Sequence, residues 1–281
     1  MSWLGAIILA IVFGVTEIYP VSGSGHFFLF EAFLGLDLTQ ADMAAYRAAL
    51  YGGIAFALML FYRRQLGRMV RDLLVSTGVL HPSGRTRGQT FPRRQRLLLT
   101  IATLPMLLAL LLNRPRLSVE RSSSALAFVA AFLALSGTAI FFLGRSARER
   151  KDIRKITGGD GLVMGFAQTL SVFPGLSRMG IVLSAAFLRG ANYSGAVEQA
   201  GLMGIPASAA AAIYLGISAK KLGPVSVSTG QCAAGFLLTA VVGMITLRVL
   251  TDRAAYRKPT GFAYWCWGAA LTALVLFLAA A

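Results

Sequence analysis

The stretch "GVTEIYPVSGSGH", residues 14–26, interrupts the first apolar run of the chain. It carries Glu17, Pro20 and His26, with several serines and glycines, where an unbroken membrane-spanning helix would carry apolar side chains. Irregular backbone inside a bilayer has no water to pair with, so it persists only where it lines a cavity or binds a ligand. Successive N–H groups of Gly/Ser turns next to a helix start form an anion site. We therefore predict a phosphate site here.

The composition indicates an all-α integral membrane protein. Of the 281 residues, 56% are hydrophobic and 14% are charged, whereas about a quarter of the residues of a soluble domain are charged. Apolar runs of about 20 residues, the length that crosses a bilayer, recur along the chain. The first run lacks the basic start and the small-residue cleavage site of a removable signal peptide, so we count it as structure.

The net charge of +16 follows from basic residues in short segments beside apolar runs, mainly 63–96, 145–160 and 251–258. This placement is typical of cytoplasmic loops, which also meet anionic lipid headgroups. It favours the lipid bilayer over nucleic acid as the partner of these residues. The pairs Lys220–Lys221 and Arg114–Arg116 fall on the outer side in this topology, against the rule.

The order of apolar runs and breaks repeats, which predicts a single membrane domain (1–281) with two halves, 1–144 and 161–281. Each half begins with a broken hydrophobic hairpin, at 3–36 and at 161–190. Three spans follow each hairpin, near 44–62, 97–113 and 125–144 in the first half and near 197–217, 230–250 and 262–281 in the second. Because three is odd, the second half is expected to be inverted relative to the first, with basic cytoplasmic loops at 63–96 and 145–160.

The two broken hairpins share a pattern. Gly14 and Glu17 in the first correspond to Gly165 and Gln168 in the second, and each pair leads to a proline and a Gly/Ser turn, "PVSGSGH" and "PGLSRMG". Paired interrupted segments of this kind indicate a binding site near the bilayer midplane. Arg178 in the second turn adds a cationic fork suited to phosphate oxygens.

Ionisable residues inside apolar segments are functional candidates, because burying them without a partner is costly. Glu17 and His26 can serve as acid or base, and His26 titrates near neutral pH. Two alternatives stay open. Glu17 can be a structural partner of Arg178, and Arg47 can either reach the membrane interface as a span boundary or bind a second phosphate.

The motif "GVTEIYPVSGSGH" resembles the first signature of the bacterial undecaprenyl-diphosphate phosphatase (bacitracin-resistance) family. "GFAQTLSVFPGLSRMG" resembles its second signature, and the resemblance spans essentially the whole chain. It implies re-entrant hairpins in inverted repeats and hydrolysis of undecaprenyl (polyprenyl) diphosphate to the monophosphate, which recycles the lipid carrier for cell-wall synthesis. It also implies a bacterial plasma-membrane location with the site open to the outer, periplasmic face.

The resemblance implies roles for individual residues. The implied catalytic residues are Glu17, Ser24, His26 and Arg178, with Ser24 or a water as nucleophile. The implied phosphate-binding residues are Ser22, Gly23, Gly25, Ser177 and Gly180, and Arg47 is added to them from its own position, as a second cation beside the first hairpin. Glu17 is the implied ligand of a divalent cation, Mg²⁺ or Ca²⁺. The implied partner is a polyprenyl diphosphate lipid, and a homodimer is left open.

The chain also departs from the family pattern. Phe13 and Arg47 stand where the family has glutamates, Gly23 and Met179 where it has serines, and Val182 where it has a threonine. The lost glutamates are expected to weaken a metal site. The alternative function is therefore a non-hydrolytic polyprenyl-phosphate binder or flippase, and a solute or ion transporter is a weaker third.

Overall fold

The computed structural model describes residues 1–36, 38–81, 90–110, 112, 120, 122, 124–146, 151–254 and 259–280. These residues form helices joined by turns, with one isolated bridge between Lys151 and Ala191. Among them, five helices are long and apolar enough to cross a membrane. They are α3 (Gln40–Phe61), α7 (Ala125–Ser146), α10 (Tyr193–Leu222), α11 (Thr229–Ala254) and α12 (Gly261–Ala280). The prediction of an all-α integral membrane protein is confirmed.

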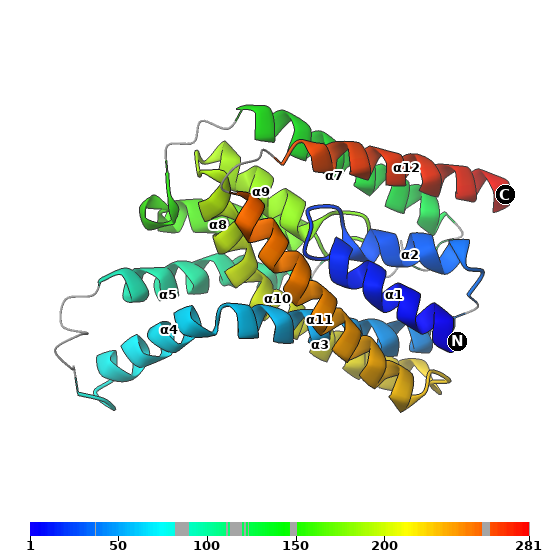
Figure 1. Cartoon of the computed structure of the whole chain (residues 1–281), viewed down its shortest axis with the longest axis horizontal. Helices are drawn as coiled ribbons and strands as arrows, with labels where there is room; N and C mark the ends of the chain where they lie inside the picture. Colours follow the sequence, from blue (N-terminus) through cyan, green and yellow to red (C-terminus); the bar gives the residue numbers. More distant parts are fainter. Residues whose placement is uncertain are drawn as a thin grey trace.

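Each predicted broken hairpin is a pair of short helices that pack against each other (Figure 1). The first pair is α1 (Trp3–Thr16) and α2 (Gly23–Phe33), and the second is α8 (Gly158–Leu170) and α9 (Arg178–Leu188). The turns between them carry the proline, serine and glycine residues that break the helical pattern. The breaks in the apolar runs are therefore where the chain reverses direction.

The span predicted near 97–113 is wrong as a continuous helix. α5 (Thr90–Thr103) ends there, and the chain continues as the 3₁₀-helix η1 (Leu104–Leu110). Pro105 lacks a backbone N–H and its ring clashes with the preceding turn of an α-helix, which explains the break. The Pro105 carbonyl accepts a hydrogen bond from the Thr169 hydroxyl at 2.8 Å instead. Positions 111 and 113 lie outside the described residues.

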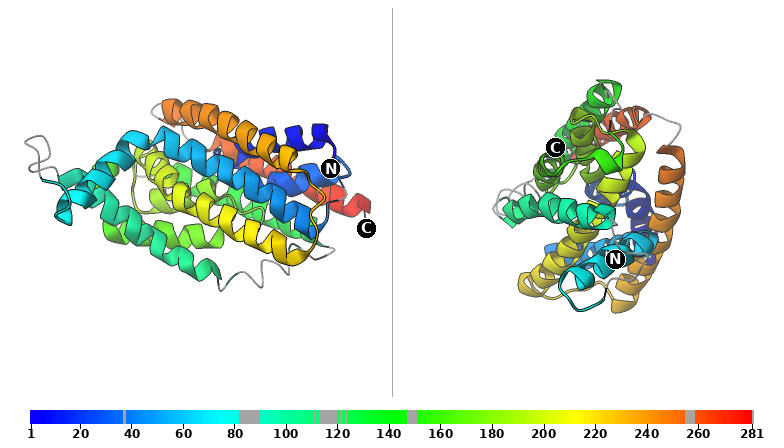
Figure 2. Two further views of the ribbon diagram at one scale, coloured as in Figure 1. Left: turned by 90° about the horizontal axis from the view of Figure 1, so that it is seen from below. Right: turned by 90° about the vertical axis from the view of Figure 1, so that its left-hand side faces the viewer.

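The segment 63–96, predicted as a loop, contains α4 (Arg63–Ser76) and the first half of α5. α4 is amphipathic: Met69 is buried, while the arginines of the helix face outward. Together α4 and α5 extend from one end of the molecule, and both termini lie at the other end (Figure 2). A short 3₁₀-helix, η2 (Ile153–Lys155), occupies part of the predicted loop 145–160.

Two of the basic segments lie side by side. The Arg94 side chain donates hydrogen bonds to the backbone carbonyls of Arg154 and Ile156, and Nη2 is 2.9 Å from the second of these. Basic residues of the predicted inner side therefore gather at the same end of the molecule. Several basic residues used in the charge argument lie outside the described residues, namely Arg114, Arg116, Arg148, Arg150, Arg257 and Lys258.

The long helices pack in pairs drawn from the two halves. α3 packs against α10 and α11, α7 against α12, α1 against α11, and α5 against α8. Close approach of α3 to α11 depends on Gly53, where a Cβ would lie 2.4 Å from the Phe236 carbonyl oxygen. These pairings agree with an exchange of equivalent elements between halves, and the inverted repeat itself stays a prediction.

The tips of the two hairpins touch. A Cβ on Gly25 would lie 3.0 Å from the Cα of Gly175, so the two backbones are in contact. Gly175 has φ +98°, and a Cβ there would lie 2.6 Å from the Val129 carbonyl oxygen. Glycine is therefore required at this tip by both conformation and space. The contact brings the two polar turns of the sequence into one site.

Candidate functional site

The two turns end in matching helix caps. The Ser22 hydroxyl accepts the Gly25 N–H at the start of α2, and the Ser177 hydroxyl accepts the Gly180 N–H at the start of α9, both at 3.1 Å. Each cap fixes the first turn of a helix whose N-terminus faces the other hairpin. Ser22 has φ +75°, the left-handed region, which a non-glycine residue adopts at a free-energy cost of about 1–3 kcal/mol. The strain sits in the turn that carries the candidate site.

Glu17 and Arg178 join the two hairpins by a buried ion pair. Arg178 Nε donates to Glu17 Oε1 at 3.1 Å, and the side chains are 8% and 6% exposed. Arg178 Nη1 donates to the Ala200 carbonyl oxygen of α10 at 3.4 Å. A Cβ on Gly204 would lie 2.6 Å from the same Nη1, so a glycine in α10 makes room for the guanidinium.

Arg47 forms a second buried ion pair. Its Nη1 lies 3.1 Å from Oε1 of Glu120, and the two side chains are 4% and 6% exposed. The rings of Phe27 and Phe28 in α2 lie 5.7 and 5.2 Å from the guanidinium carbon, within the range of cation–π attraction. Arg47 is therefore held in place from α2 and from Glu120. Its guanidinium is enclosed by protein groups.

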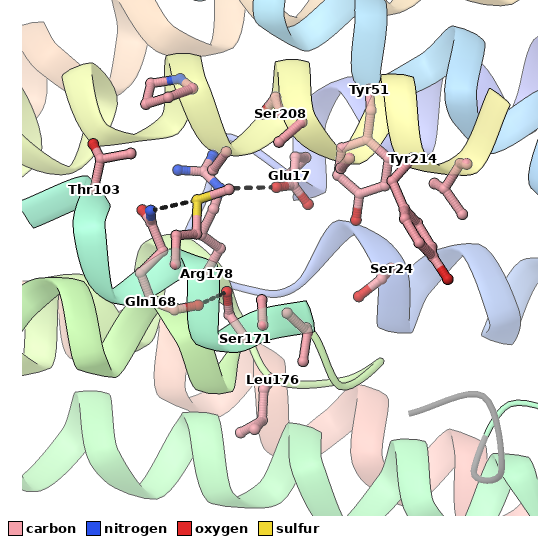
Figure 3. Close-up of a pocket in the computed structure, with 18 of the residues that line it drawn as sticks. Glu17, Ser24, Tyr51, Thr103, Gln168, Ser171, Leu176, Arg178, Ser208 and Tyr214 are labelled. Atoms are coloured by element: carbon pink, nitrogen blue, oxygen red, sulfur yellow. Dashed lines mark hydrogen bonds and ion pairs between the residues drawn. The ribbon is translucent and has the colours of Figure 1, made fainter. Parts of the chain in front are cut away.

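A cavity of about 400 Å³ opens beside the Glu17–Arg178 ion pair (Figure 3), and Arg47 also lines it. Glu17 and Arg178 face each other near its centre, with Ser24 and Tyr51 on one side and Gln168 on the other. The broken segment α5–η1 and the helix α10 supply much of the rest of the wall. These further lining residues include Thr103, Met106, Leu107, Ala109, Pro206, Ala207, Ser208, Ala210, Ala211, Tyr214 and Leu215. The cavity thus combines buried charges with an apolar wall.

Four polar atoms of lining side chains are buried and have no hydrogen-bond partner among the described residues. They are Arg178 Nη2, Arg47 Nε, Gln168 Oε1 and Ser208 Oγ. Leaving a buried donor or acceptor unpaired is destabilising, more so for a charged group. Half of the unpaired buried side-chain atoms of the described residues belong to this lining, where a water or a ligand can supply the missing partner.

Residues 6–272 match the family model of the bacitracin resistance protein BacA. The chain belongs to the BacA family. It is similar to the undecaprenyl-diphosphatase of Rubrobacter xylanophilus, with 32% identity over 285 residues that cover 99% of this chain and 100% of the relative. It is also similar to the undecaprenyl-diphosphatase of Cutibacterium acnes, with 29% identity over 277 residues that cover 94% of this chain and 93% of the relative. The matched region includes the turns of both hairpins and every residue that lines the cavity.

In this BacA family member the cavity brings together four of the residues predicted from the sequence, Glu17, Ser24, Arg47 and Arg178. The other predicted phosphate-binding residues lie in the turns and helix starts beside the cavity and do not line it. They are Ser22, Gly23, Gly25, Ser177 and Gly180. The hydroxyls of Ser22 and Ser177 accept the hydrogen bonds of the helix caps described above.

Of the two serines in the first turn, Ser24 is the one that lines the cavity, and its Oγ is 3.5 Å from Ser22 Oγ. Gly23, between the two serines, packs directly on Glu17. A Cβ there would lie 2.5 Å from Glu17 Oε2 and 2.7 Å from Glu17 Cβ. The serine that the family pattern places at Gly23 would therefore collide with Glu17 in this BacA protein, and the hydroxyl is supplied one position later.

His26 lies outside the cavity lining, and both of its ring nitrogens have partners. Nδ1 is 2.8 Å from the Ser22 carbonyl oxygen, which can only accept, and Nε2 is 2.9 Å from Trp265 Nε1, which can only donate. The pattern assigns the neutral imidazole with the proton on Nδ1. In this arrangement His26 connects the turn to α12. Both ring nitrogens are engaged in hydrogen bonds, and the acid–base role of His26 stays a prediction.

The donor set of this BacA protein does not fit a divalent cation. Among the described residues, no three His, Cys, Asp or Glu side chains gather to hold a metal. Glu17, the predicted metal ligand, is paired with Arg178, and Glu120 is paired with Arg47. Hard cations need several anionic or neutral oxygen ligands, and two guanidinium groups beside them are repulsive.

Two cavity features were missed in the sequence. Glu120 lies in a polar stretch between apolar runs, and its partner Arg47 is 73 positions away, so no local pattern reveals it. Ser208 follows Pro206 inside α10, and only the fold places it on the cavity. Glu198 of α10, a further acidic residue within an apolar segment, accepts hydrogen bonds from Gln65 and Gln95, and Arg189 pairs with Asp160.

Proposed function

We propose that this chain is an integral membrane phosphatase that hydrolyses undecaprenyl diphosphate to the monophosphate. The observation that carries the proposal is the cavity, which sets two buried arginines, a carboxylate and a hydroxyl against an apolar wall. A lipid diphosphate has the same division between a charged head and an apolar chain. The BacA family membership and the printed name of the relatives, undecaprenyl-diphosphatase, support the same substrate and favour hydrolysis over a binder or flippase.

The phosphates are bound chiefly by Arg178. Its Nε stays on Glu17 while Nη2 is unpaired beside the cavity, so the guanidinium is oriented before the ligand arrives. The start of α2 at the cavity adds backbone N–H groups and the positive end of a helix dipole. Preorganised positive groups of this kind stabilise the charge on a transferring phosphoryl group.

Hydrolysis breaks the bond between the terminal phosphorus and the bridging oxygen. Either a water or Ser24 Oγ attacks the terminal phosphorus, and Glu17 accepts the proton of the nucleophile. The bridging oxygen leaves with the lipid monophosphate. With water as nucleophile, inorganic phosphate forms directly. With Ser24, a phosphoserine forms first and a water then hydrolyses it.

The location and assembly belong to the same proposal. A bacterial plasma-membrane protein with α4 and α5 in the cytoplasm would have both termini at the outer face, because these lie at opposite ends of the molecule (Figure 2). The substrate would then enter from the outer, periplasmic side. A homodimer stays a prediction, and cross-linking in native membranes tests it.

The proposal is tested with purified protein in detergent or nanodiscs, incubated with C15 and C55 prenyl diphosphates. Released phosphate and the lipid monophosphate are measured in parallel, with and without divalent cations. We expect equal amounts of both products from the parent chain and none from Glu17→Gln. Tight binding of the lipid without phosphate release would instead support the binder or flippase.

A further inference from the structure

Arg47 lines the cavity close to two buried ion pairs, its own with Glu120 and that of Glu17 with Arg178. Glu17–Arg178 and Glu120–Arg47 both lie within electrostatic reach of Tyr51, and Arg47 also interacts with Glu17. Both arginines line the cavity, and both are more than nine-tenths buried. The site therefore holds two fixed positive charges, each in direct contact with one carboxylate, and a third carboxylate, Glu31 of α2, lies within electrostatic reach of Arg47 and Glu120.

These charges disfavour the binding of a metal ion. Each paired carboxylate already accepts from a guanidinium, and a divalent cation beside them would face both arginines across a short, poorly solvated distance. A diphosphate head brings several negative charges and many acceptor oxygens. It can satisfy the N–H groups that the cavity leaves unpaired, Arg178 Nη2 and Arg47 Nε.

We propose that Arg47 takes the place of a divalent cation in this chain, so that Arg47 and Arg178 together bind the substrate diphosphate without metal. The inference rests on the proposed function in that the ligand is a prenyl diphosphate. Arg47 is suited to the role because the rings of Phe27 and Phe28 and the Glu120 carboxylate hold it in place. Arginine stays charged when buried and can contact two phosphate oxygens at once.

A structural role for Arg47 makes a different prediction. If Arg47 only neutralises Glu120, removing both charges together would leave lipid binding unchanged. If Arg47 binds the diphosphate, the affinity falls whether or not Glu120 is changed as well. The double variant Arg47→Gln/Glu120→Gln separates these cases and avoids a buried unpaired carboxylate, which would threaten folding.

The experiment measures the affinity for a C15 prenyl diphosphate by titration of the monodisperse protein, once in excess chelator and once with Mg²⁺ or Ca²⁺. We expect the dissociation constant of the parent chain to differ by no more than about twofold between the two buffers. Arg47→Gln/Glu120→Gln should bind about tenfold or more weakly, the loss expected for a charge-assisted contact. The matched control Arg96→Gln/Asp72→Asn removes an ion pair that lies outside the cavity lining and should bind like the parent.

Two results would overturn the inference. One is parent binding that weakens about tenfold in chelator and returns with added metal. The other is parent-like affinity in the double variant. Binding that is independent of metal and dependent on Arg47, in a protein that releases no phosphate, would support the inference while contradicting the proposed hydrolysis, so the two failures are distinguishable.

Discussion

Glu17 and Arg178 are 161 positions apart in the chain, yet Arg178 Nε donates a hydrogen bond of 3.1 Å to Glu17 Oε1. The pair links the turn of one hairpin to the first turn of α9 in the other, at the centre of the cavity. Each residue thereby orients the other. A ligand that binds Arg178 Nη2 also acts on the side chain that the proposed mechanism uses as base.

Arg178→Lys should weaken prenyl-diphosphate binding and any turnover, and Arg178→Ala should do so more severely. Lysine offers one charged centre and lacks the planar fork by which arginine contacts Glu17 through Nε and leaves its Nη atoms for phosphate oxygens. Losing a charge-assisted contact costs about 1.5–3 kcal/mol, or about 10- to 150-fold in affinity. The dissociation constant is measured on the monodisperse fraction. An unchanged constant for Arg178→Ala would show that Arg178 serves only to neutralise Glu17.

Glu17→Gln should abolish phosphate release and leave lipid binding nearly intact. The glutamine amide oxygen can still accept from Arg178 Nε, so the guanidinium keeps its orientation, while the proton acceptor is lost. Phosphate release and affinity are measured on the same preparation. Near-parental release by this variant would exclude Glu17 as the base.

Gly23→Ser restores the family serine, and on resemblance alone it should speed hydrolysis. The structure predicts the opposite, because the new Cβ would lie 2.5 Å from Glu17 Oε2 and displace that carboxylate. We expect lower thermal stability and slower phosphate release. Gly67→Ser in α4 is the matched control, since nothing lies within 4 Å of a Cβ there. Faster hydrolysis by Gly23→Ser would mean that the turn adapts and the missing hydroxyl limits the parent.

His26→Asn tests whether the imidazole acts as an acid or base. The asparagine amide can replace the Nδ1 donor to the Ser22 carbonyl oxygen but cannot titrate. If His26 holds the turn in place, the variant keeps the parental pH profile and loses at most a few-fold in rate, while His26→Ala loses more. The pH dependence of phosphate release decides between the two roles. If His26 acts as an acid or base, one limb of the pH–rate profile should be missing in His26→Asn.

Asp160, at the start of α8, should make the stability of the protein depend on pH. Burial alone would raise its pKa, but hydrogen bonds from Lys151, the Thr157 N–H and Arg189 hold the pKa of the carboxyl below its usual range. The stabilisation is therefore complete above the unfolded pKa of about 4 and is lost as the pH falls below it. Asp160→Asn should lower the free energy of unfolding at pH 7 by on the order of 2 kcal/mol.

Unfolding of the parent and Asp160→Asn is compared between pH 7 and pH 3 in one detergent. The difference between the two proteins should shrink as the pH approaches 3, because the Asp160 carboxyl of the unfolded parent then protonates while the native carboxyl, whose pKa is lowered, still stays ionised. A difference that stays constant with pH would show that the contacts of Asp160 do not depend on its charge.

The sequence alone determined the membrane class, the two broken hairpins and the residues on their turns. Long apolar runs and the residues that interrupt them are local features, and the physics of a bilayer allows few structures for them. The family resemblance likewise rests on contiguous motifs around Glu17 and Arg178. These conclusions did not depend on knowing which segments meet.

Only the tertiary structure decided which side chains share the cavity and what each one contacts. Arg47 pairs with Glu120, which is 73 positions away in the chain, and Gly23 packs against Glu17. Both ring nitrogens of His26 form hydrogen bonds, with Ser22 and Trp265. The break at Pro105 likewise turned a predicted span into part of the cavity wall. Such contacts depend on helix packing between distant segments, and the energy of a buried charge depends on the partner that packing brings to it.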